Sequence, residues 1–385
     1  MIYLDHAAAT PVSKKAIEAM QKYFAEDFFN PSAAYLPAVS VRKDYEAAKA
    51  QIAEVIGAKG ADLIVTSGAT ESINLAFKSV GANAKVLVSG VEHPAVLGNA
   101  KQAGSFEVVR VDKNGRVDVE DLKSKITPDV QMISVCLASS ELGTIQPLSE
   151  IANIVKAEKQ RRLMAGDRTP LYLHSDASQG LGLMEVKVNR LGVDMLTLNA
   201  AKVYGPKGVG VLWVSHDVKL QPITVGGGQE RGLRSGTENV SGVVGFATAI
   251  QQSEKHLVSE RKHIMKMRDA LKKILSAEKD IMFLGNPKVR LVNFLPIAIP
   301  GIDAERLIFK LESEGILVST GAACSASKGV KSRTLQEIGL SDEEIAGSLR
   351  ISLGKLNSED DMKIAGEKIL KAIAEEKQRL AGMRS

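Results

Sequence analysis

The sequence is poor in cysteine and in long apolar runs. Only two of its 385 residues are cysteines, Cys136 and Cys324, so a disulfide framework cannot form, and neither has a spacing to the six histidines that suggests a structural metal site. No stretch approaches the roughly 20 apolar residues of a membrane span, and the first residues lack a basic segment followed by a long apolar run. We therefore expect no metal, no membrane anchor and a cytoplasmic location.

Charge of one sign is not in large excess either. The 50 Lys and Arg residues stand against 45 Asp and Glu, and the resulting +5 is too small to argue for a nucleic-acid or membrane partner. A composition of 44% hydrophobic and 25% charged residues is that of an ordinary globular protein and excludes collagen-like or wholly disordered chains. The length suggests two domains, or one large domain with an appendage.

Seven short apolar runs alternate with amphipathic segments over residues 62–214. The intervening segments have helical periodicity at 71–78, 93–102, 118–126 and 147–164. This alternation predicts an α/β fold with one large, mostly parallel seven-stranded sheet covered by helices. The seven runs are DLIVTS (62–67), KVLVSG (85–90), FEVVRV (106–111), DVQMISVCLAS (129–139), PLYLHSD (170–176), VDMLTLNA (193–200) and GVGVLWVS (208–215).

The remainder of the chain predicts a smaller α+β domain. A polar, glycine-rich segment at 229–242 precedes a long helical pattern at 243–276, which we interpret as a connecting helix. Apolar runs at 289–298, 315–319 and 348–354 then mix with helical patterns at 303–313 and 358–380. We expect a large domain at 15–250 and a small domain formed by 1–14 together with 251–385.

Two polar residues lie at or just after the carboxyl ends of predicted strands. Lys202 comes after the run at 193–200 and before a Gly-Pro-Lys-Gly turn, so it is expected at a strand end facing a cleft, or else as a loop lysine in solvent. Asp176 ends the strand at 170–176, and the carboxyl ends of strands are where open α/β sheets bind ligands. A carboxylate there could pair with the pyridinium nitrogen of a pyridoxal cofactor, or could simply cap a helix.

Two further segments could bind a phosphate and provide a group for proton transfer, respectively. Ser67, Gly68, Ala69 and Thr70 open a helix, whose free N–H groups can bind phosphate, although capping explains the same pattern. His93 lies just beyond another strand near the same edge of the sheet, where a single histidine is more often structural than catalytic.

Taken together, ten segments resemble the cysteine desulfurases of the NifS and IscS type, which are class V aminotransferase-fold enzymes. They occur in that family's order and spacing from Tyr3 to about Gly354. The resemblance implies the fold of type I transferases that depend on pyridoxal 5'-phosphate. The segments are YLDHAAATP, FNPSAAY, TSGATESINLA, EHPAVL, ELGTIQP, HSDASQ, AKVYGPKG, GGGQERGLRSGTEN, STGAACSAS and RISLG.

The resemblance also implies a role for individual residues. Lys202 would bind the cofactor covalently, Asp176 would pair with its ring nitrogen and Gln179 with its ring hydroxyl, and His93 would stack on the ring and shuttle protons. Arg350 and Asn30 would bind the substrate, and Cys324 would accept the sulfur. The remaining cofactor contacts would come from Ala69 and Thr70 at the phosphate, from Ser140 and Asn199, and from Thr237, which in this family reaches the phosphate of the opposite subunit of a homodimer.

The two cysteines are expected to differ. A thiolate that receives sulfur and carries it away has to be partly exposed and mobile, and Cys324 lies in GAACSASKG, whose small residues favour a flexible loop. Without the family resemblance, Cys324 would be interpreted as a small apolar residue in a turn. Cys136 lies within an apolar run and is expected to be buried and inert.

The sequence departs from the family pattern at three points. Asn199 and Ala201 stand where the lysine motif usually has serine and histidine, which would weaken cofactor binding by about ten- to a hundredfold if one charge-assisted hydrogen bond is lost. Ser139 and Ser140 replace two asparagines, and Tyr35 replaces a histidine. These changes affect the expected rate and substrate choice more than the fold or the cofactor.

The resemblance therefore predicts an L-cysteine desulfurase. It would form L-alanine and a persulfide on Cys324 that supplies sulfur to an acceptor protein, such as an iron–sulfur scaffold, or to tRNA thiolation. The alternatives are a selenocysteine lyase, another class V lyase or aminotransferase, or a catalytically weakened scaffold protein.

Overall fold

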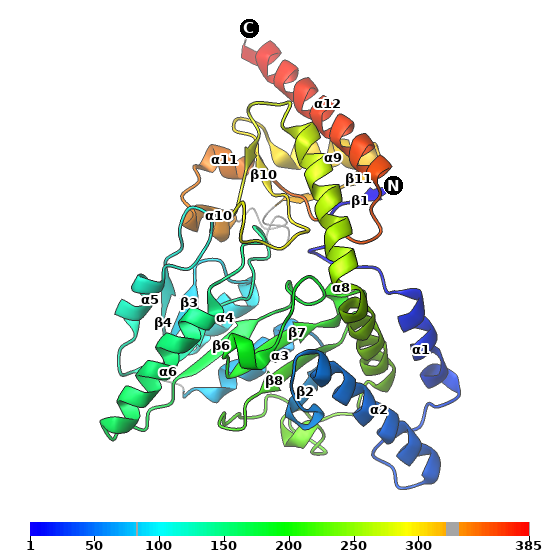
Figure 1. Ribbon diagram of the computed structural model, residues 1–385, viewed down its shortest axis with the longest axis vertical. Coiled ribbons are helices and arrows are strands. Elements are labelled where there is room, and N and C mark those ends of the chain that lie inside the picture. Colours follow the sequence, from blue (N-terminus) through cyan, green and yellow to red (C-terminus); the bar gives the residue numbers. More distant parts are fainter. Residues whose placement is uncertain (82–83, 321–330, 385) are drawn as a thin grey trace.

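The computed structural model describes residues 1–81, 84–320 and 331–384. The long helix α8 (Val240–Leu275) runs from the part of the molecule that holds the large sheet to the part that carries the C-terminal helix α12 (Glu359–Arg384) (Figure 1). The predicted connecting helix and the predicted C-terminal helix are thus both confirmed. In the described residues, we find no helix that combines the length and the apolar character needed to span a membrane.

The large sheet has the seven strands that the sequence predicts, in the order β2-β8-β7-β6-β5-β3-β4. Neighbours from β7 to β4 are parallel, whereas β8 is antiparallel to both β7 and β2, so the sheet is mostly parallel, as expected. The strands are β2 (Leu63–Thr66), β3 (Lys85–Ser89), β4 (Ser105–Val109), β5 (Val130–Ser134), β6 (Tyr172–Asp176), β7 (Met195–Asn199) and β8 (Gly210–Val214).

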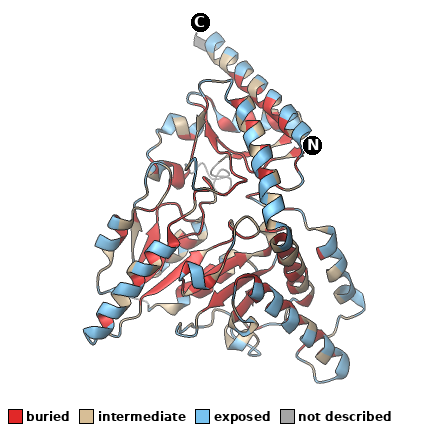
Figure 2. Cartoon of the chain, in the orientation of Figure 1, coloured by how far each residue is buried: buried red, intermediate tan, exposed pale blue. Residues whose placement is uncertain are grey.

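Helices cover this sheet, which explains why apolar residues predominate in its strands. In Figure 2 the strands are largely buried and the helices expose one side to solvent. The predicted helices at 71–78, 93–102, 118–126 and 147–164 are all present, with ends that shift by a few residues. The helices of this part are α1 (Lys14–Ala25), α2 (Leu36–Val55), α3 (Ala69–Ala76), α4 (Pro94–Gln102), α5 (Val119–Lys125), α6 (Leu148–Met164) and α7 (Val188–Leu191).

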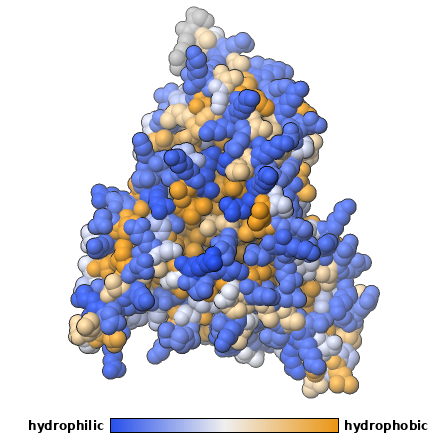
Figure 3. All heavy atoms as spheres, in the orientation of Figure 1, coloured by the Kyte–Doolittle hydropathy of each residue, from blue (hydrophilic) through white to orange (hydrophobic). Residues whose placement is uncertain are grey.

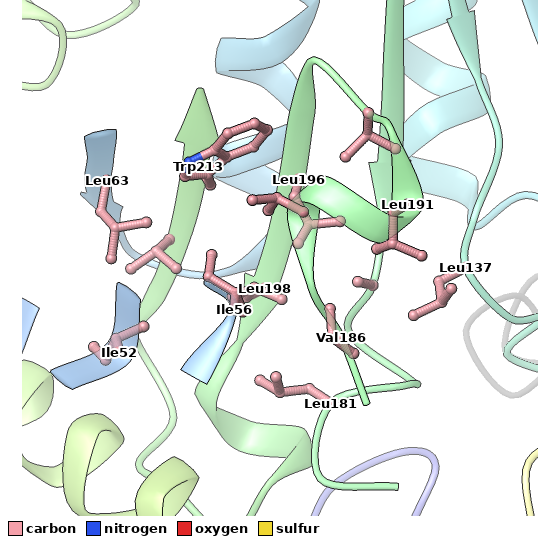
Figure 4. Close-up of a cluster of buried hydrophobic side chains, with 14 of the residues drawn as sticks. Ile52, Ile56, Leu63, Leu137, Leu181, Val186, Leu191, Leu196, Leu198 and Trp213 are labelled. Carbon is pink, nitrogen blue, oxygen red and sulfur yellow. The ribbon is translucent and has the colours of Figure 1, made fainter. Parts of the chain in front are cut away.

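Apolar packing joins distant segments of the chain into a core on one face of the large sheet. Figure 4 shows Ile52 of α2 and Leu63 of β2 with Leu196 of β7 and Trp213 of β8 in one buried cluster. The first half of α8 buries Phe246 in this cluster, and its second half packs into a separate cluster in the smaller part of the molecule. On the face seen in Figure 3, hydrophobic side chains gather between these two parts.

The smaller part contains short strands and helices, as expected of an α+β region. Its sheets have the orders β12-β13-β10-β9 and β1-β11, so the first residues of the chain pair with a strand far along the sequence. The strands are β1 (Ile2–Tyr3), β9 (Met282–Phe283), β10 (Ile297–Ala298), β11 (Ile316–Leu317), β12 (Ser319–Thr320) and β13 (Ser348–Arg350). The helices are α9 (Ala304–Ser313), α10 (Arg333–Glu337) and α11 (Asp342–Ala346).

The predicted strand at 289–298 is mostly wrong, because only Ile297–Ala298 form a strand. Most of the apolar residues before it are buried, although Val289 is exposed. Their backbone bonds to loops: the N–H of Leu291 donates to Gly143, and the N–H of Ile145 donates to Val289. A β-carbon at Gly143 would lie 2.5 Å from Phe294, which shows how closely this loop packs on the run. An apolar run predicts burial, and burial alone does not decide the backbone conformation.

Candidate active site

A cavity of about 370 Å³ lies where the parallel strands end, and its size is typical of a small-molecule site. It brings together most of the site residues expected from the sequence. Those that line it are Ala69, Thr70, His93, Ser140, Asp176, Gln179, Asn199, Lys202 and Arg350.

Three expected residues are not part of this group. Asn30 and Thr237 are exposed, and neither is among the described residues of this chain that line the cavity. Cys324 lies outside the described residues. The roles of all three stay predictions.

Lys202 is fixed at the rim of the sheet by a short turn. Strand β7 ends at Asn199, and the 3-10 turn Ala200–Lys202 turns the side chain into the cavity. Its Nζ donates to the carbonyl oxygen of Ala7 at 2.8 Å and also to that of Ala8. The lysine thus contacts the N-terminal segment of the chain, and the alternative of a loop lysine extending into solvent is wrong.

Asp176 is the last residue of β6 and lines the same cavity. Its Oδ1 accepts a hydrogen bond from the backbone N–H of Ser178 at 2.9 Å, which closes a turn. No helix begins at these described residues, so the interpretation of Asp176 as a helix cap is wrong, and its pairing with a ring nitrogen stays a prediction. Gln179 donates from Nε2 to the carbonyl oxygen of Ala7 at 3.0 Å. The hydroxyl of Ser178, also on the cavity wall, is buried and has no hydrogen-bond partner among the described residues.

The N-terminus of α3 is set against the sheet by two glycines. Gly68 precedes the helix with φ at 152°, a conformation that favours glycine, and a β-carbon on Gly210 of β8 would lie 2.6 Å from the carbonyl carbon of Gly68. This close approach places Ala69 and Thr70 on the cavity wall. Free N–H groups in a first helical turn and the positive end of the helix dipole suit a phosphate.

His93 both caps a helix and lines the cavity. Its Nδ1 accepts a hydrogen bond from the N–H of Ala95 at 3.1 Å at the start of α4, so the neutral ring carries its proton on Nε2. Burial lowers the pKa of His93. The negative charge of Asp176 raises this pKa, and the positive charges of Lys202 and Arg350 lower it further. The ring is therefore neutral at pH 7 and able to accept a proton.

Arg350, the last residue of β13, is buried at the opposite wall. Its Nη2 donates to Asp5 Oδ1 at 2.7 Å and its Nη1 to the carbonyl oxygen of Ser140 at 3.2 Å. Its buried Nε has no hydrogen-bond partner in the part of the chain that the structure describes. A guanidinium with N–H donors left over suits a carboxylate ligand.

Among the residues that depart from the family pattern, Asn199 has a clear local role. Asn199 accepts a hydrogen bond from the N–H of Ala201 at 3.1 Å and so caps the turn that holds Lys202. The Ala201 side chain offers no polar group. Tyr35 is exposed and precedes α2.

Sequence reasoning missed several residues of the site. Ser178 and Glu141 lie next to predicted residues in the sequence and could have been found by their proximity. Ala7 and Ala8 contribute backbone carbonyl groups, for which an alanine side chain gives no signal. Asp5 forms an ion pair with Arg350, and only the fold shows that contact.

Two buried groups adjoin the cavity: Cys136 is part of its lining, and Glu92 lies behind the wall. Glu92 accepts hydrogen bonds at Oε1 from the Ser89 hydroxyl and from the Cys136 N–H, both at 2.6 Å. Burial raises the pKa of Glu92 to about 8, and the nearby Asp176 adds to this shift. Burial also raises the pKa of the Cys136 thiol, which confirms the prediction that this cysteine is buried.

A large mixed sheet that carries a lysine, an aspartate and a helix N-terminus at one end defines a class of cofactor-dependent enzymes. The family model described as aminotransferase class-V matches residues 2–364, and the chain belongs to that family. Members of this family use pyridoxal phosphate.

Comparison with similar proteins shows which group within the class V family the chain belongs to. Cysteine desulfurase IscS 1 of Archaeoglobus fulgidus is 40% identical over 372 residues, which cover 94% of each chain. Cysteine desulfurase IscS of Methanosarcina thermophila is 35% identical over 99% of this chain and 93% of its own. A solved NifS-like protein has a TM-score of 0.88 at 31% identity and covers 97% of this chain and 99% of its own. Within the class V family, the chain belongs to the cysteine desulfurases.

The residues present fit pyridoxal phosphate. The cavity offers an amine for covalent attachment, a carboxylate for a ring nitrogen and a helix N-terminus for a phosphate, which are the groups that this cofactor requires. The buried Ser178 hydroxyl, unpartnered among the described residues, adds a polar group that a ligand in the cavity could satisfy.

Proposed function

We propose that the protein takes sulfur from L-cysteine, releases L-alanine and transfers the sulfur through Cys324 to an acceptor protein. The observation that carries this proposal is that Lys202, Asp176 and Arg350 line one cavity although they come from three separate strands or their ends. This set provides for a covalent cofactor, its ring nitrogen and the carboxylate of an amino acid.

The cofactor would be held from several sides. Lys202 would bind it covalently, Asp176 and Gln179 would contact the ring, and Ala69 and Thr70 would bind the phosphate through the start of α3. When bound, pyridoxal phosphate takes up the electron pair of the substrate's α-carbon.

The chain's own residues supply binding and proton transfer. Arg350 would bind the substrate carboxylate, and the Lys202 amine would take the α-proton and later return a proton. His93, neutral at pH 7, accepts and donates protons beside it. The carbon–sulfur bond of cysteine breaks and a sulfur–sulfur bond to Cys324 forms, so that L-cysteine and a thiol become L-alanine and a persulfide.

Other parts of the proposal concern assembly and location. We propose a homodimer in which Thr237 contacts the phosphate bound by the partner subunit, with Asn30 at the substrate, and both side chains are exposed in the single chain. The names of the IscS relatives support an acceptor in iron–sulfur cluster assembly. We also propose a cytoplasmic location, and domains at 15–250 and at 1–14 with 251–385.

The proposed function is tested by measuring L-alanine and sulfide formed from L-cysteine in the presence of a reducing thiol. The unaltered protein is expected to form both in equal amounts, and Cys324→Ala is expected to lose at least about 90% of the activity because the acceptor thiol is gone. Cys136→Ala is the matched control: it removes the chain's other thiol, which is buried in the cavity wall and has a raised pKa that makes it a poor acceptor, and it should retain most of the activity.

Selenocysteine in parallel separates the desulfurase from a selenocysteine lyase. Activity with selenocysteine and none with cysteine would favour the lyase. Full activity of Cys324→Ala with cysteine would contradict the sulfur-carrying role of that residue. A purified protein that pyridoxal phosphate cannot colour and that forms no alanine would favour a scaffold.

A further inference from the structure

The N-terminal segment 5–8 contacts both walls of the cavity. On the large-sheet side, the carbonyl oxygen of Ala7 accepts hydrogen bonds from Lys202 and Gln179. On the other side, the N–H of Ala7 donates to the Ser352 hydroxyl at 2.9 Å and Asp5 pairs with Arg350. Four residues at the start of the chain thus join the lysine of the site to its arginine.

The pair between Asp5 and Arg350 is well shielded from solvent. The exposed fraction is 15% for the Asp5 side chain and 7% for that of Arg350, and the separation is 2.7 Å. An ion pair in such a position is less screened by water and salt than a surface pair, and losing one partner leaves a costly buried charge.

The contacts of Arg350 also fix the plane of its guanidinium. Asp5 accepts from Nη2, and the carbonyl oxygen of Ser140 accepts from Nη1. Two acceptors on different nitrogens prevent rotation of the planar group and leave other N–H donors unused. A guanidinium held in this way can meet a carboxylate with little loss of side-chain entropy.

We propose that Asp5 is a positioning residue that holds Arg350 in the orientation required to bind the substrate carboxylate. This inference rests on the proposed function, in which Arg350 binds that carboxylate. Asp5 itself is not among the described residues that line the cavity, so it acts through the arginine and does not contact substrate.

The expected loss of substrate affinity can be calculated from the hydrogen bond between Asp5 and Arg350 that the variants alter. A hydrogen bond to a charged group contributes roughly 1.5–3 kcal/mol, which corresponds to about a ten- to hundredfold change in affinity. Asp5→Ala removes the acceptor and its charge, whereas Asp5→Asn keeps an acceptor oxygen of the same size and removes only the charge. The asparagine variant should therefore be affected less than the alanine variant.

The experiment compares KM and kcat for L-cysteine in the holoenzymes of the unaltered protein, Asp5→Asn and Asp5→Ala. We expect KM to rise about three- to tenfold in Asp5→Asn and about ten- to hundredfold in Asp5→Ala, with kcat changed by less than about threefold. The affinity for L-alanine, which has the same carboxylate, should fall in parallel. The absorbance of the bound cofactor is recorded for all three proteins, because the charge of Asp5 also interacts with Lys202 and a spectral change would reveal an effect through the lysine.

Asp194→Asn is the matched control, since the Asp194 side chain has the same exposed fraction of 15% and pairs with Lys159 at 2.7 Å before β7 begins, remote from the cavity lining. This variant should lower the thermal unfolding midpoint without raising KM. An unchanged or lower KM in a folded Asp5→Ala or Asp5→Asn would overturn the proposal, because it would mean that Asp5 is neutral or competes for Arg350.

The measurements distinguish a failure of the proposed function from a failure of the proposed role of Asp5. If the unaltered holoenzyme forms no alanine from cysteine, the proposed function fails, and the affinity for L-alanine still reports on Arg350. If the unaltered enzyme is active and the alanine affinity is the same in all three proteins, only the role of Asp5 fails.

Discussion

Glu92 is a buried carboxylic acid directly before the site histidine. Its Oε1 accepts two hydrogen bonds, whereas its Oε2 is buried without a partner among the described residues. A pKa of about 8 keeps this group protonated at neutral pH, so the second oxygen carries a proton and no buried charge.

The protonated carboxyl of Glu92 predicts how the free energy of unfolding depends on pH. The pKa of Glu92 in the folded protein, about 8, lies above its ordinary value of 4.5, so the folded protein binds the proton more tightly than the unfolded chain does. The stabilisation is complete below the lower pKa and is lost as the pH rises towards the higher one. Glu92→Gln cannot titrate and should lack this loss.

Urea unfolding of the unaltered protein and of Glu92→Gln between about pH 5 and pH 8 measures the effect. The unaltered protein should lose stability relative to the variant by up to roughly 1.4 kcal/mol for each pH unit. A difference between the two proteins that does not change with pH would show that Glu92 is ionised when folded.

Individual site residues could be predicted from the sequence where a side chain follows an apolar run. Lys202, Asp176 and His93 all stand in that position, and all three line the cavity. Ala7 and Asp5 could not be predicted, because one uses its backbone and the other acts through a residue that lies 345 positions away. Contacts of that kind depend on the folded chain alone.

The start of α3 depends on a close contact with β8. Gly210 approaches Gly68 so closely that a β-carbon at Gly210 would lie 2.6 Å from the Gly68 backbone and 2.9 Å from the carbonyl oxygen of Leu198. A larger residue would push the first turn of α3 away from the sheet, and with it the N–H groups proposed to bind phosphate.

Gly210→Ala should therefore weaken both the fold and cofactor binding. We expect a loss of about 1–3 kcal/mol in stability from overpacking, and a lower affinity for pyridoxal phosphate. Thermal unfolding and an absorbance titration measure the two effects. Gly98→Ala is the control, since Gly98 lies inside α4 with open space around a β-carbon and should gain up to about 1 kcal/mol. Equal affinity in both variants would contradict the role of this contact.

Elements of the large sheet were predictable because each apolar run there becomes a strand, and all of these strands except the edge strand β4 are largely buried. The run at 289–298 has the same apolar character, yet it bonds to the loop around Gly143 and forms a strand only at its end. Its backbone partners include that loop, about 150 residues earlier in the chain, and the residues 351–353 that follow β13. Local patterns therefore predict strands well where neighbouring strands repeat regularly, and less well where irregular segments from distant parts of the chain provide the partners.

The molecule as a whole assembles its cavity from both ends of the chain. The segment 5–8, the ends of β6 and β7 and the residue Arg350 of β13 meet at one site, and α8 packs into the apolar clusters of both parts. The cavity of one chain is lined without Thr237 among its described residues, although the family resemblance gives this residue a role at the phosphate. The proposed homodimer would account for this difference, because Thr237 would then serve the cavity of the partner subunit.

Mixed dimers test this assembly directly. Lys202→Ala lacks the lysine of its own cavity, and Thr237→Ala lacks the threonine proposed to serve the partner. If Thr237 acts across the interface, one cavity of a mixed dimer contains both an intact Lys202 and an intact Thr237, while the other cavity lacks both. Mixing and reassociating two nearly inactive variants should then restore activity to roughly a quarter of that of the unaltered protein, because about half the dimers are mixed and each has one complete cavity. If Thr237 acts within its own chain, every cavity in the mixture lacks one residue, and the activity should not exceed the average of the two variants.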